Sequence, residues 1–281
     1  MLGRALASSG PPNVELIALS HEQLDITRSD AVASTLNTLR PHIVINASGF
    51  TAVDRAETER AEAFAVNATA VAELGSACKR HGVAVVHFGT DYVFDGASSR
   101  PYREDDPARP INYYGETKLA GEQAVLASGA KALVIRTQWL FGAEGSSFAR
   151  TMWERARRRE HTRVVDDQRG RPTCAADVAH ATWRLIDSEV SGLCHLASSG
   201  DATWYDVARQ IFGRLGVPEL LVPCETADLP RPARRPAYSV LDTTRAESLL
   251  GSGLPAWPDA LGVFLEALPR REAAADGDRC A

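Results

Sequence analysis

A tyrosine and a lysine stand four residues apart, at Tyr114 and Lys118, in a segment whose pattern predicts a helix from Tyr113 to Leu126. Residues at this spacing emerge on one face of a helix. A free tyrosine has a pKa of about 10 and is a poor acid near neutral pH. A neighbouring ammonium would lower that pKa, so the pair could protonate a carbonyl oxygen. The alternative is a surface lysine beside a packed tyrosine.

A threonine extends this pattern. Thr90 follows the apolar run Val83–Phe88, which predicts a strand. Open α/β sheets bind ligands at the carboxyl ends of their strands, and a hydroxyl there could donate to the same carbonyl oxygen. The alternative is a turn residue before Asp91.

Small and polar residues close a second predicted strand at 42–47. Asn46, Ala47 and Ser48 have short side chains that would let a nicotinamide ribose approach the backbone. Asn67, in the next helical stretch, could tie its helix to the sheet edge without touching a ligand. Both features point to a binding edge at the ends of neighbouring strands.

Short β-branched runs alternate with helical stretches in the first half of the chain. The expected strands are 14–19, 42–47, 83–88 and 132–136, and the expected helices are 29–39, 58–80 and 113–126. These strands lack polar alternation, so both faces should be buried, as in a parallel sheet covered by helices. The pattern predicts an α/β fold with a doubly wound parallel sheet.

The alternation of strands and helices is less regular after about residue 140. Expected there are helices over 175–186 and 203–215, a strand over 193–197, and loops over 166–173 and 229–236. We expect a first part over 1–145, a smaller α/β part over 146–270 with some segments returning to the first, and a frayed tail over 271–281.

Composition excludes several classes of protein. The 281 residues are 44% hydrophobic and carry a net charge of −5, which disfavours nucleic-acid binding. No apolar run suggests a membrane span and no signal peptide opens the chain, so a cytoplasmic protein is expected. Five cysteines without a CxxC pair are expected to be free thiols, and His87 and His195 lack metal-ligand spacing.

Seven stretches resemble the dTDP-4-dehydrorhamnose reductases. They are Asn46–Glu57, Thr90–Gly96, Tyr114–Glu122, Arg136–Gly142, Asp167–Thr173, Thr203–Asp206 and Arg235–Asp242. The resemblance covers nearly the whole chain in order. It implies an extended short-chain dehydrogenase/reductase of Rossmann type, in which the first part binds NAD(P)H and the second binds a dTDP-sugar. The implied reaction reduces the C4 keto group of a dTDP-4-dehydro-6-deoxy-L-sugar, giving dTDP-L-rhamnose from dTDP-4-dehydrorhamnose.

The resemblance also implies roles for individual residues. Thr90, Tyr114 and Lys118 would be catalytic, with Tyr114 donating a proton to the sugar O4. Besides Tyr114 and Lys118, the cofactor would be bound by Gly3, Asp25, Ile26, Asn46, Ala47, Ser48, Thr51 and Asn67. The substrate would be bound by Thr90, Asp91, Tyr92, Trp139, Arg171, Pro172 and Arg235. A packed core tryptophan is the alternative for Trp139, and a solvated loop charge is the alternative for Arg235.

The cofactor, assembly and start of the chain are the remaining expectations. NADPH is expected, with NADH open because His21 stands where relatives often carry arginine. A homodimer and a dependence on Mg²⁺ are left open, although some family members dimerise through the metal. Met1–Gly3 matches the end of the family's GxxGxxG turn. We therefore expect the first strand and most of that turn to be missing, with roughly ten further residues upstream in the working protein.

Three other functions compete with this interpretation. A dTDP-dihydrostreptose synthase or related antibiotic deoxysugar ketoreductase would share the motifs. A non-catalytic NAD(P)-binding regulatory subunit would share the fold, as in methionine adenosyltransferase, but the presence of Thr90, Tyr114 and Lys118 favours an enzyme. An epimerase of the same superfamily is disfavoured by the loop Asp167–Thr173.

Overall fold

Alternating strands and helices run through the computed structural model, which describes residues 1–268. The helices are α1 (Leu2–Ser8), α2 (Ser29–Leu39), α3 (Arg60–Phe64), α4 (Ala70–His81), α5 (Tyr113–Ala127), α6 (Phe148–Arg157), α7 (Ala175–Asp187), α8 (Trp204–Arg214), α9 (Thr244–Leu250) and α10 (Trp257–Ala267). The strands are β1 (Ile43–Asn46), β2 (Ala84–Thr90), β3 (Ala132–Thr137), β4 (Leu140–Phe141), β5 (Thr162–Val165), β6 (Arg169–Gly170), β7 (Thr173–Cys174), β8 (Gly192–His195), β9 (Ser198–Ser199), β10 (Ala202–Thr203), β11 (Leu221–Cys224) and β12 (Leu254–Ala256). Short helical turns are η1 (Arg55–Glu57), the π-helical η2 (Ala65–Thr69), η3 (Asp91–Val93), η4 (Pro218–Leu220) and η5 (Thr226–Asp228).

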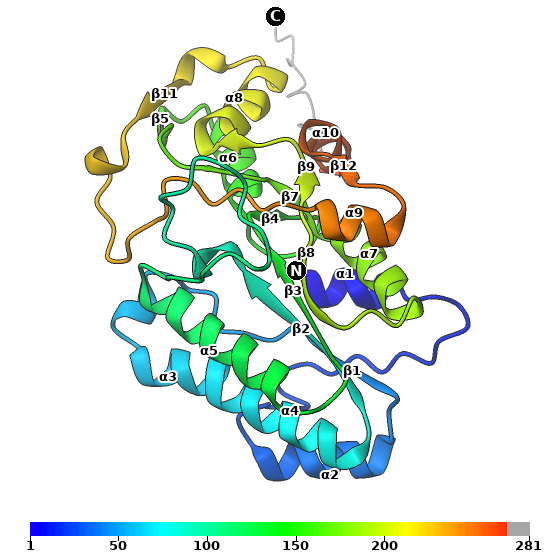
Figure 1. Ribbon diagram of the computed structural model, residues 1–281. Coiled ribbons are helices and arrows are strands. Elements are labelled where there is room, and N and C mark those ends of the chain that lie inside the picture. The colour runs from blue at the N-terminus through cyan, green and yellow to red at the C-terminus, as the bar shows by residue number, and fades with distance from the viewer. Residues whose placement is uncertain (269–281) are drawn as a thin grey trace, which may run out of the picture.

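The central sheet has four parallel strands in the order β1-β2-β3-β8. Helices α2, α4 and α5 lie on one side of it, and α1, α7 and α9 lie on the other (Figure 1). The parallel sheet between two helical layers confirms the α/β fold class predicted from the unbroken apolar strands.

Successive side chains of the strands contribute alternately to two separate apolar cores. Val85 and Val134 pack with α2, α4 and α5, whereas Val86 and Ile135 pack with α1 and α7. Successive strand residues point to opposite faces, so each strand needs apolar side chains at consecutive positions. This explains why these strands read as continuous apolar runs.

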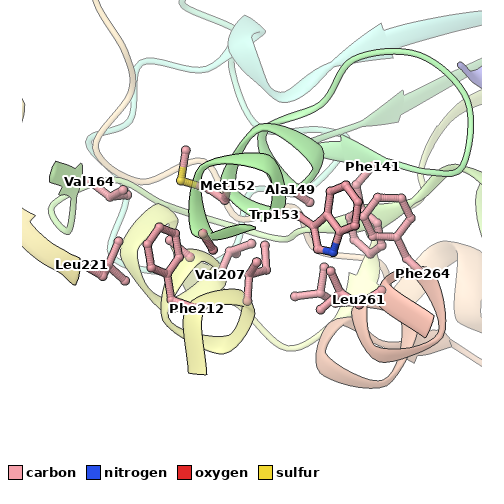
Figure 2. Packing of buried hydrophobic residues seen from close by; sticks show 14 of the residues in the cluster. Phe141, Ala149, Met152, Trp153, Val164, Val207, Phe212, Leu221, Leu261 and Phe264 are labelled. Atoms are coloured by element: carbon pink, nitrogen blue, oxygen red, sulfur yellow. The ribbon is translucent and has the colours of Figure 1, made fainter. Parts of the chain in front are cut away.

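A second group of elements builds a separate core beyond the carboxyl ends of the sheet. Helices α6, α8 and α10 contribute to this core, and α8 packs on the parallel pair β5–β11 (Figure 1). Figure 2 shows Phe212, Phe264 and Trp153 in this core, with the rings of Phe141 and Phe264 5.5 Å apart. The chain returns to the first layers through α7 and β8, since β8 pairs with β3.

Most of the predicted elements form close to their expected bounds. The expected helix 58–80 is instead divided among α3, the π turn η2 and α4. Within that turn the backbone carbonyl of Asn67 lies against Gly121 of α5, where a side chain would collide with it. The expected frayed tail, 271–281, lies outside the described residues.

The predicted strand Val14–Leu19 is wrong. The segment is irregular, and its apolar side chains are exposed, with Ile17 at 49%. No strand among residues 1–268 pairs with it, and β1 lies at the edge of the described sheet. An apolar run without a partner for its backbone groups forms no ladder, whatever its β propensity.

Candidate active site

Helix α5 carries Tyr114 and Lys118, and several contacts fix its first turn. Asn112 precedes the helix, and its Oδ1 accepts a hydrogen bond from the Gly115 backbone N–H at 2.8 Å. The backbone N–H of Tyr113 donates to Glu57 Oε1 at 2.9 Å. These caps satisfy N–H groups that a helix start leaves free, so they determine where the tyrosine lies.

Thr90 ends β2 and lies beside this helix. Its Oγ1 donates to Asp91 Oδ1 at 3.1 Å and accepts from the Tyr92 backbone N–H at 3.2 Å. The rings of Tyr92 and Tyr114 meet edge to face, with centroids 5.8 Å apart. Thr90, Tyr114 and Lys118 are all buried at the carboxyl edge of the sheet, so the structure brings the predicted trio to one place.

Lys118 is buried with its ammonium facing the sheet. Lys118 Nζ donates to the Phe88 carbonyl at 2.6 Å, two residues before Thr90 on β2. Burial lowers the pKa of Lys118 to about 8, although the carboxylate of Glu122 acts against this shift. A cation held at this edge can stabilise negative charge that develops on a neighbouring oxygen.

The pKa of Tyr114 is shifted in the direction opposite to our prediction. Burial raises it above its usual value, the charges of Asp91 and Glu122 raise it further, and a hydrogen bond with Thr90 lowers it. The Lys118 ammonium donates to the Phe88 carbonyl. The phenol therefore keeps its proton at neutral pH, as a proton donor must.

Asp91, predicted to bind substrate, has both carboxylate oxygens occupied within the protein. Oδ1 accepts from Thr90, and Oδ2 accepts from Ser239 Oγ at 2.6 Å. Burial raises the pKa of Asp91 to about 7, against the lowering effect of these two hydrogen bonds. The contacts make Asp91 a support for Thr90 and a link to the segment that contains Ser239.

The loop after β1 lies next to this trio. Asn46 Oδ1 accepts from the Ser48 backbone N–H at 3.1 Å and from its hydroxyl at 2.5 Å. A Cβ atom on Gly3 would lie 3.4 Å from Ala47 Cβ, so α1 approaches the loop closely. Thr51 is exposed at the far end of the loop.

Asn67 fastens that loop to the helices. Its Oδ1 accepts from the Phe50 backbone N–H at 2.8 Å, and its Nδ2 donates to the Phe50 carbonyl and to Thr117 Oγ1. With both amide hydrogens used, the side chain is a structural tie, the first of the two roles predicted for it.

Asp25 and Ile26 lie half-buried in a turn that precedes α2. Asp25 Oδ1 accepts from the backbone N–H and hydroxyl of Thr27, at 2.9 and 2.7 Å, and these bonds lower its pKa. The structure shows no contact between this turn and Thr90, Tyr114 or Lys118.

Arg235, predicted to contact a diphosphate, faces the loop after β1. Its Nη1 lies 3.0 Å from Asp54 Oδ1, and its guanidinium lies 5.9 Å from the centre of the Tyr92 ring. Asp54 also accepts from the Ala233 backbone N–H at 3.2 Å. Arg235 is thus held over Tyr92 by an acid from the loop that follows β1, and its side chain is only 13% exposed.

Trp139 is half-buried and packs against a second tryptophan. It stacks on Trp204 with ring centroids 3.6 Å apart, and its φ of 48° is left-handed.

Arg171 donates from Nη1 to Thr243 Oγ1 at 3.0 Å, while Pro172 is buried. The residue Arg169 pairs through its backbone with the segment that contains Ser239.

Four functional candidates were missed from the sequence: Asp54, Asn112, Glu122 and Trp204. Asp54 and Glu122 stand within the motifs quoted above, and Glu122 follows Lys118 by four residues. Residues four apart share one face of a helix, so this spacing could have predicted that Glu122 lies beside Lys118. The pairing of Asp54 with Arg235 spans most of the chain and left no local trace.

The nicotinamide cofactor implied by the resemblance fits this edge on its ribose side. A Cβ on Gly49 would lie 3.9 Å from Lys118 Nζ, so the absence of a side chain there leaves space over the ammonium. Ammonium and hydroxyl groups suit ribose hydroxyls. Among residues 1–268 there is no group of three or more His, Cys, Asp or Glu placed to hold a metal. No described helix is long and apolar enough to cross a membrane.

Comparison with known proteins identifies the family. The family described as "RmlD substrate binding domain" matches residues 1–269. A Streptomyces antibioticus protein named probable dTDP-4,6-dihydroxy-2-methyloxan-3-one 4-ketoreductase is 44% identical, over 96% of this chain and 92% of its own. The dTDP-4-dehydrorhamnose reductase of Burkholderia thailandensis is 38% identical, over 95% and 94%.

A solved structure agrees with these matches. The dTDP-4-dehydrorhamnose reductase of Bacillus anthracis, in complex with NADP, has a TM-score of 0.91 and 33% identity, and 95% of each chain is covered. The sequence matches and the structural match therefore point to the same family, and both extend over nearly the whole chain. The chain belongs to the dTDP-4-dehydrorhamnose reductase family.

Proposed function

We propose that this chain is an NADPH-dependent reductase of the C4 ketone of a dTDP-4-dehydro-6-deoxy-L-sugar, with dTDP-4-dehydrorhamnose as the first substrate to test. The observation that carries the proposal is the buried trio of Thr90, Tyr114 and Lys118 at the carboxyl edge of β2. Family membership supports the reaction class, because relatives over nearly the whole chain are named as ketoreductases of dTDP-sugars.

Each member of the trio has a distinct task. Tyr114 holds a proton on its phenol oxygen and donates it to the sugar O4. Lys118 stabilises the phenolate that remains, since a cation in a water-poor site interacts strongly with developing charge. Thr90 orients the ketone oxygen beside the phenol. When bound, the reduced nicotinamide supplies the hydride that C4 accepts.

The neighbouring segments hold the two ligands. The residues Ala47, Ser48 and Lys118 would line the ribose side of the cofactor. NADPH is proposed over NADH because a solved relative is described in complex with NADP. Arg235, already directed over Tyr92, would pair with the diphosphate of the sugar nucleotide, since guanidinium binds phosphate oxygens in a bidentate manner.

The test measures NADPH oxidation with enzymatically prepared dTDP-4-dehydrorhamnose. Tyr114→Phe removes the donated proton and should lower kcat by about 10²–10⁴, the usual contribution of a positioned acid. Tyr113→Phe is the matched control, because Tyr113 lies on the same turn and stacks with Arg60. Equal turnover by Tyr114→Phe and the wild type would reject the assigned acid.

A second ketosugar is a specific candidate. The Streptomyces antibioticus relative is named as acting on dTDP-4,6-dihydroxy-2-methyloxan-3-one, and it is 44% identical to this chain. We therefore propose comparing kcat/KM for both ketosugars. A clear preference for this second ketone would assign the chain to an antibiotic deoxysugar pathway, while the reaction and the catalytic trio would stay the same.

A further inference from the structure

Glu122 is a buried acid that the proposed reaction does not yet use. It lies one helical turn beyond Lys118 on α5 and is 1% exposed. On this face of the helix it follows Tyr114 and Lys118 at spacings of four residues, so all three side chains are directed to β2. Gly89 of β2 makes the approach possible, because a side chain at that position would collide with Glu122 Oε1.

Hydrogen-bond donors surround the Glu122 carboxylate. Oε2 accepts from Arg136 Nε at 2.8 Å, and Arg136 Nη2 lies 2.8 Å from the same oxygen. Oε1 accepts from the Thr90 backbone N–H at 3.4 Å. An ionised carboxylate offers only acceptors, so these donors favour the charged form, against the effect of burial, which raises the pKa of Glu122.

Glu122 and Lys118 hold the end of β2 between them. Lys118 Nζ donates to the Phe88 carbonyl, and the Thr90 N–H donates to Glu122. These two backbone groups flank Gly89 on one side of the strand. Thr90 is the last residue of this strand. The contacts of Glu122 and Lys118 with the strand therefore determine where the Thr90 hydroxyl lies.

We propose that Glu122 is a positioning residue of the reductase, whose negative charge keeps Lys118 as an ammonium and whose carboxylate holds the end of β2 under Thr90. Its role rests on the proposed function, because Lys118 and Thr90 act in that reaction. Arg136 compensates the charge of Glu122 from β3, where it lies opposite Gly89 in the register.

The electrostatic surroundings of Lys118 allow this coupling to be measured. Titratable and charged groups surround Lys118 from several elements. They are Tyr114 and Glu122 on α5, His87 on β2, Asp91 on η3 and Arg136 on β3. Glu57 of η1 and Arg60 of α3 contact the neighbouring Tyr113. Of these, Glu122 is the group whose charge raises the pKa of Lys118 against the effect of burial. Loss of that charge should make Lys118 easier to deprotonate.

The whole chain contains three lysines, which makes Lys118 directly observable. Lysine labelled with ¹³C at Cε gives three resonances, and the substitution Lys118→Met assigns one of them. In Glu122→Gln we expect the Lys118 resonance to titrate about one pH unit lower than in the wild type. Lys79 and Lys131 serve as internal references.

Glu116→Gln is the matched control, because Glu116 lies on the same helix but is exposed. It should leave the Lys118 titration unchanged. If Glu122→Gln folds poorly, Glu122→Met/Arg136→Met removes both charges of the pair, which often costs little stability. Its Lys118 should also titrate below the wild-type value. An unchanged Lys118 midpoint in the folded Glu122 variants would overturn the proposal.

Kinetics provide the second readout. In Glu122→Gln the alkaline limb of kcat/KM should move to lower pH by the same amount as the Lys118 resonance, whereas a merely structural role would change stability alone. The NMR titration needs no turnover. If the wild type fails to reduce the ketosugar, the proposed function fails, while the titration still decides whether Glu122 controls Lys118.

Discussion

Tyr114 and Lys118 lie one helical turn apart, and burial shifts their pKa values in opposite directions. It raises the pKa of the phenol and lowers that of the ammonium to about 8, because burial disfavours the charged form of each. Near neutral pH the site therefore contains a protonated phenol beside an ammonium that still carries its charge. This combination suits a proton donor to a ketone better than a phenolate would.

Asp91 gives a prediction for the pH dependence of stability. Its pKa is about 7 in the folded protein, against a usual 3.8, so the folded state binds the extra proton between these values. Stability contributed by this proton is complete below pH 3.8 and is lost as pH rises through 7. From pH 5 to 8 the wild type should lose roughly 2–3 kcal/mol relative to Asp91→Asn.

Urea unfolding of both proteins at the two pH values checks this expectation. Asp105→Asn is the control, since Asp105 is an exposed acid and its substitution should leave the pH dependence of the wild type intact. A constant difference between the wild type and Asp91→Asn across this pH range would contradict the assignment of a raised pKa to Asp91.

At the scale of elements, the start of α5 connects the two halves of the site. Asn112 caps the helix through Gly115, and its Nδ2 donates to the Arg234 carbonyl at 2.8 Å. Arg234 adjoins Arg235, which is expected to hold the diphosphate. One side chain therefore positions both α5 and the segment that contains Arg234 and Arg235.

Asn112→Ala should reduce both stability and turnover. Loss of the cap costs about 0.5–2 kcal/mol, and misplacement of Tyr114 should lower kcat by roughly 10-fold or more. Ser147→Ala is the matched control, because Ser147 caps α6 through the Arg150 backbone N–H. It should cost similar stability with kcat unchanged. If both variants kept wild-type kcat, the α5 cap would have no part in positioning Tyr114.

At the scale of the whole molecule, the second core stabilises the part that faces the sheet. Phe212 of α8 has no exposed surface in this core (Figure 2). Phe212→Ala should lower the free energy of unfolding by about 3–5 kcal/mol, through lost burial and the cavity that remains. Val222→Ala, at a position 46% exposed on β11, should change it by at most about 0.5 kcal/mol.

Urea denaturation followed by circular dichroism measures both variants. Losses of equal size would show that the α8 position does not belong to a tightly packed core. The contrast tests the packing, since Phe212 and Val222 are both apolar and lie in the same part of the molecule.

Local pattern predicted most elements of the sheet region. Strands β1, β2 and β3 and helices α2 and α5 lie close to their expected bounds, because apolar runs and helical periodicity reflect local burial. The segment Val14–Leu19 has the same apolar pattern and is not a strand. Strand formation needs a paired neighbour, and propensity alone does not supply one.

Linear sequence was enough to establish the order of most elements, the spacing of Tyr114 and Lys118, and the motifs that mark the family. These features reside in neighbouring residues, so they can be recognised before the chain is folded. Tertiary structure decided which groups are charged and what each polar side chain holds. Arg136 reaches Glu122, Ser239 reaches Asp91, and Arg235 reaches Asp54 only in the folded chain. Burial and distant charges set pKa values, and both arise from packing between segments far apart in sequence.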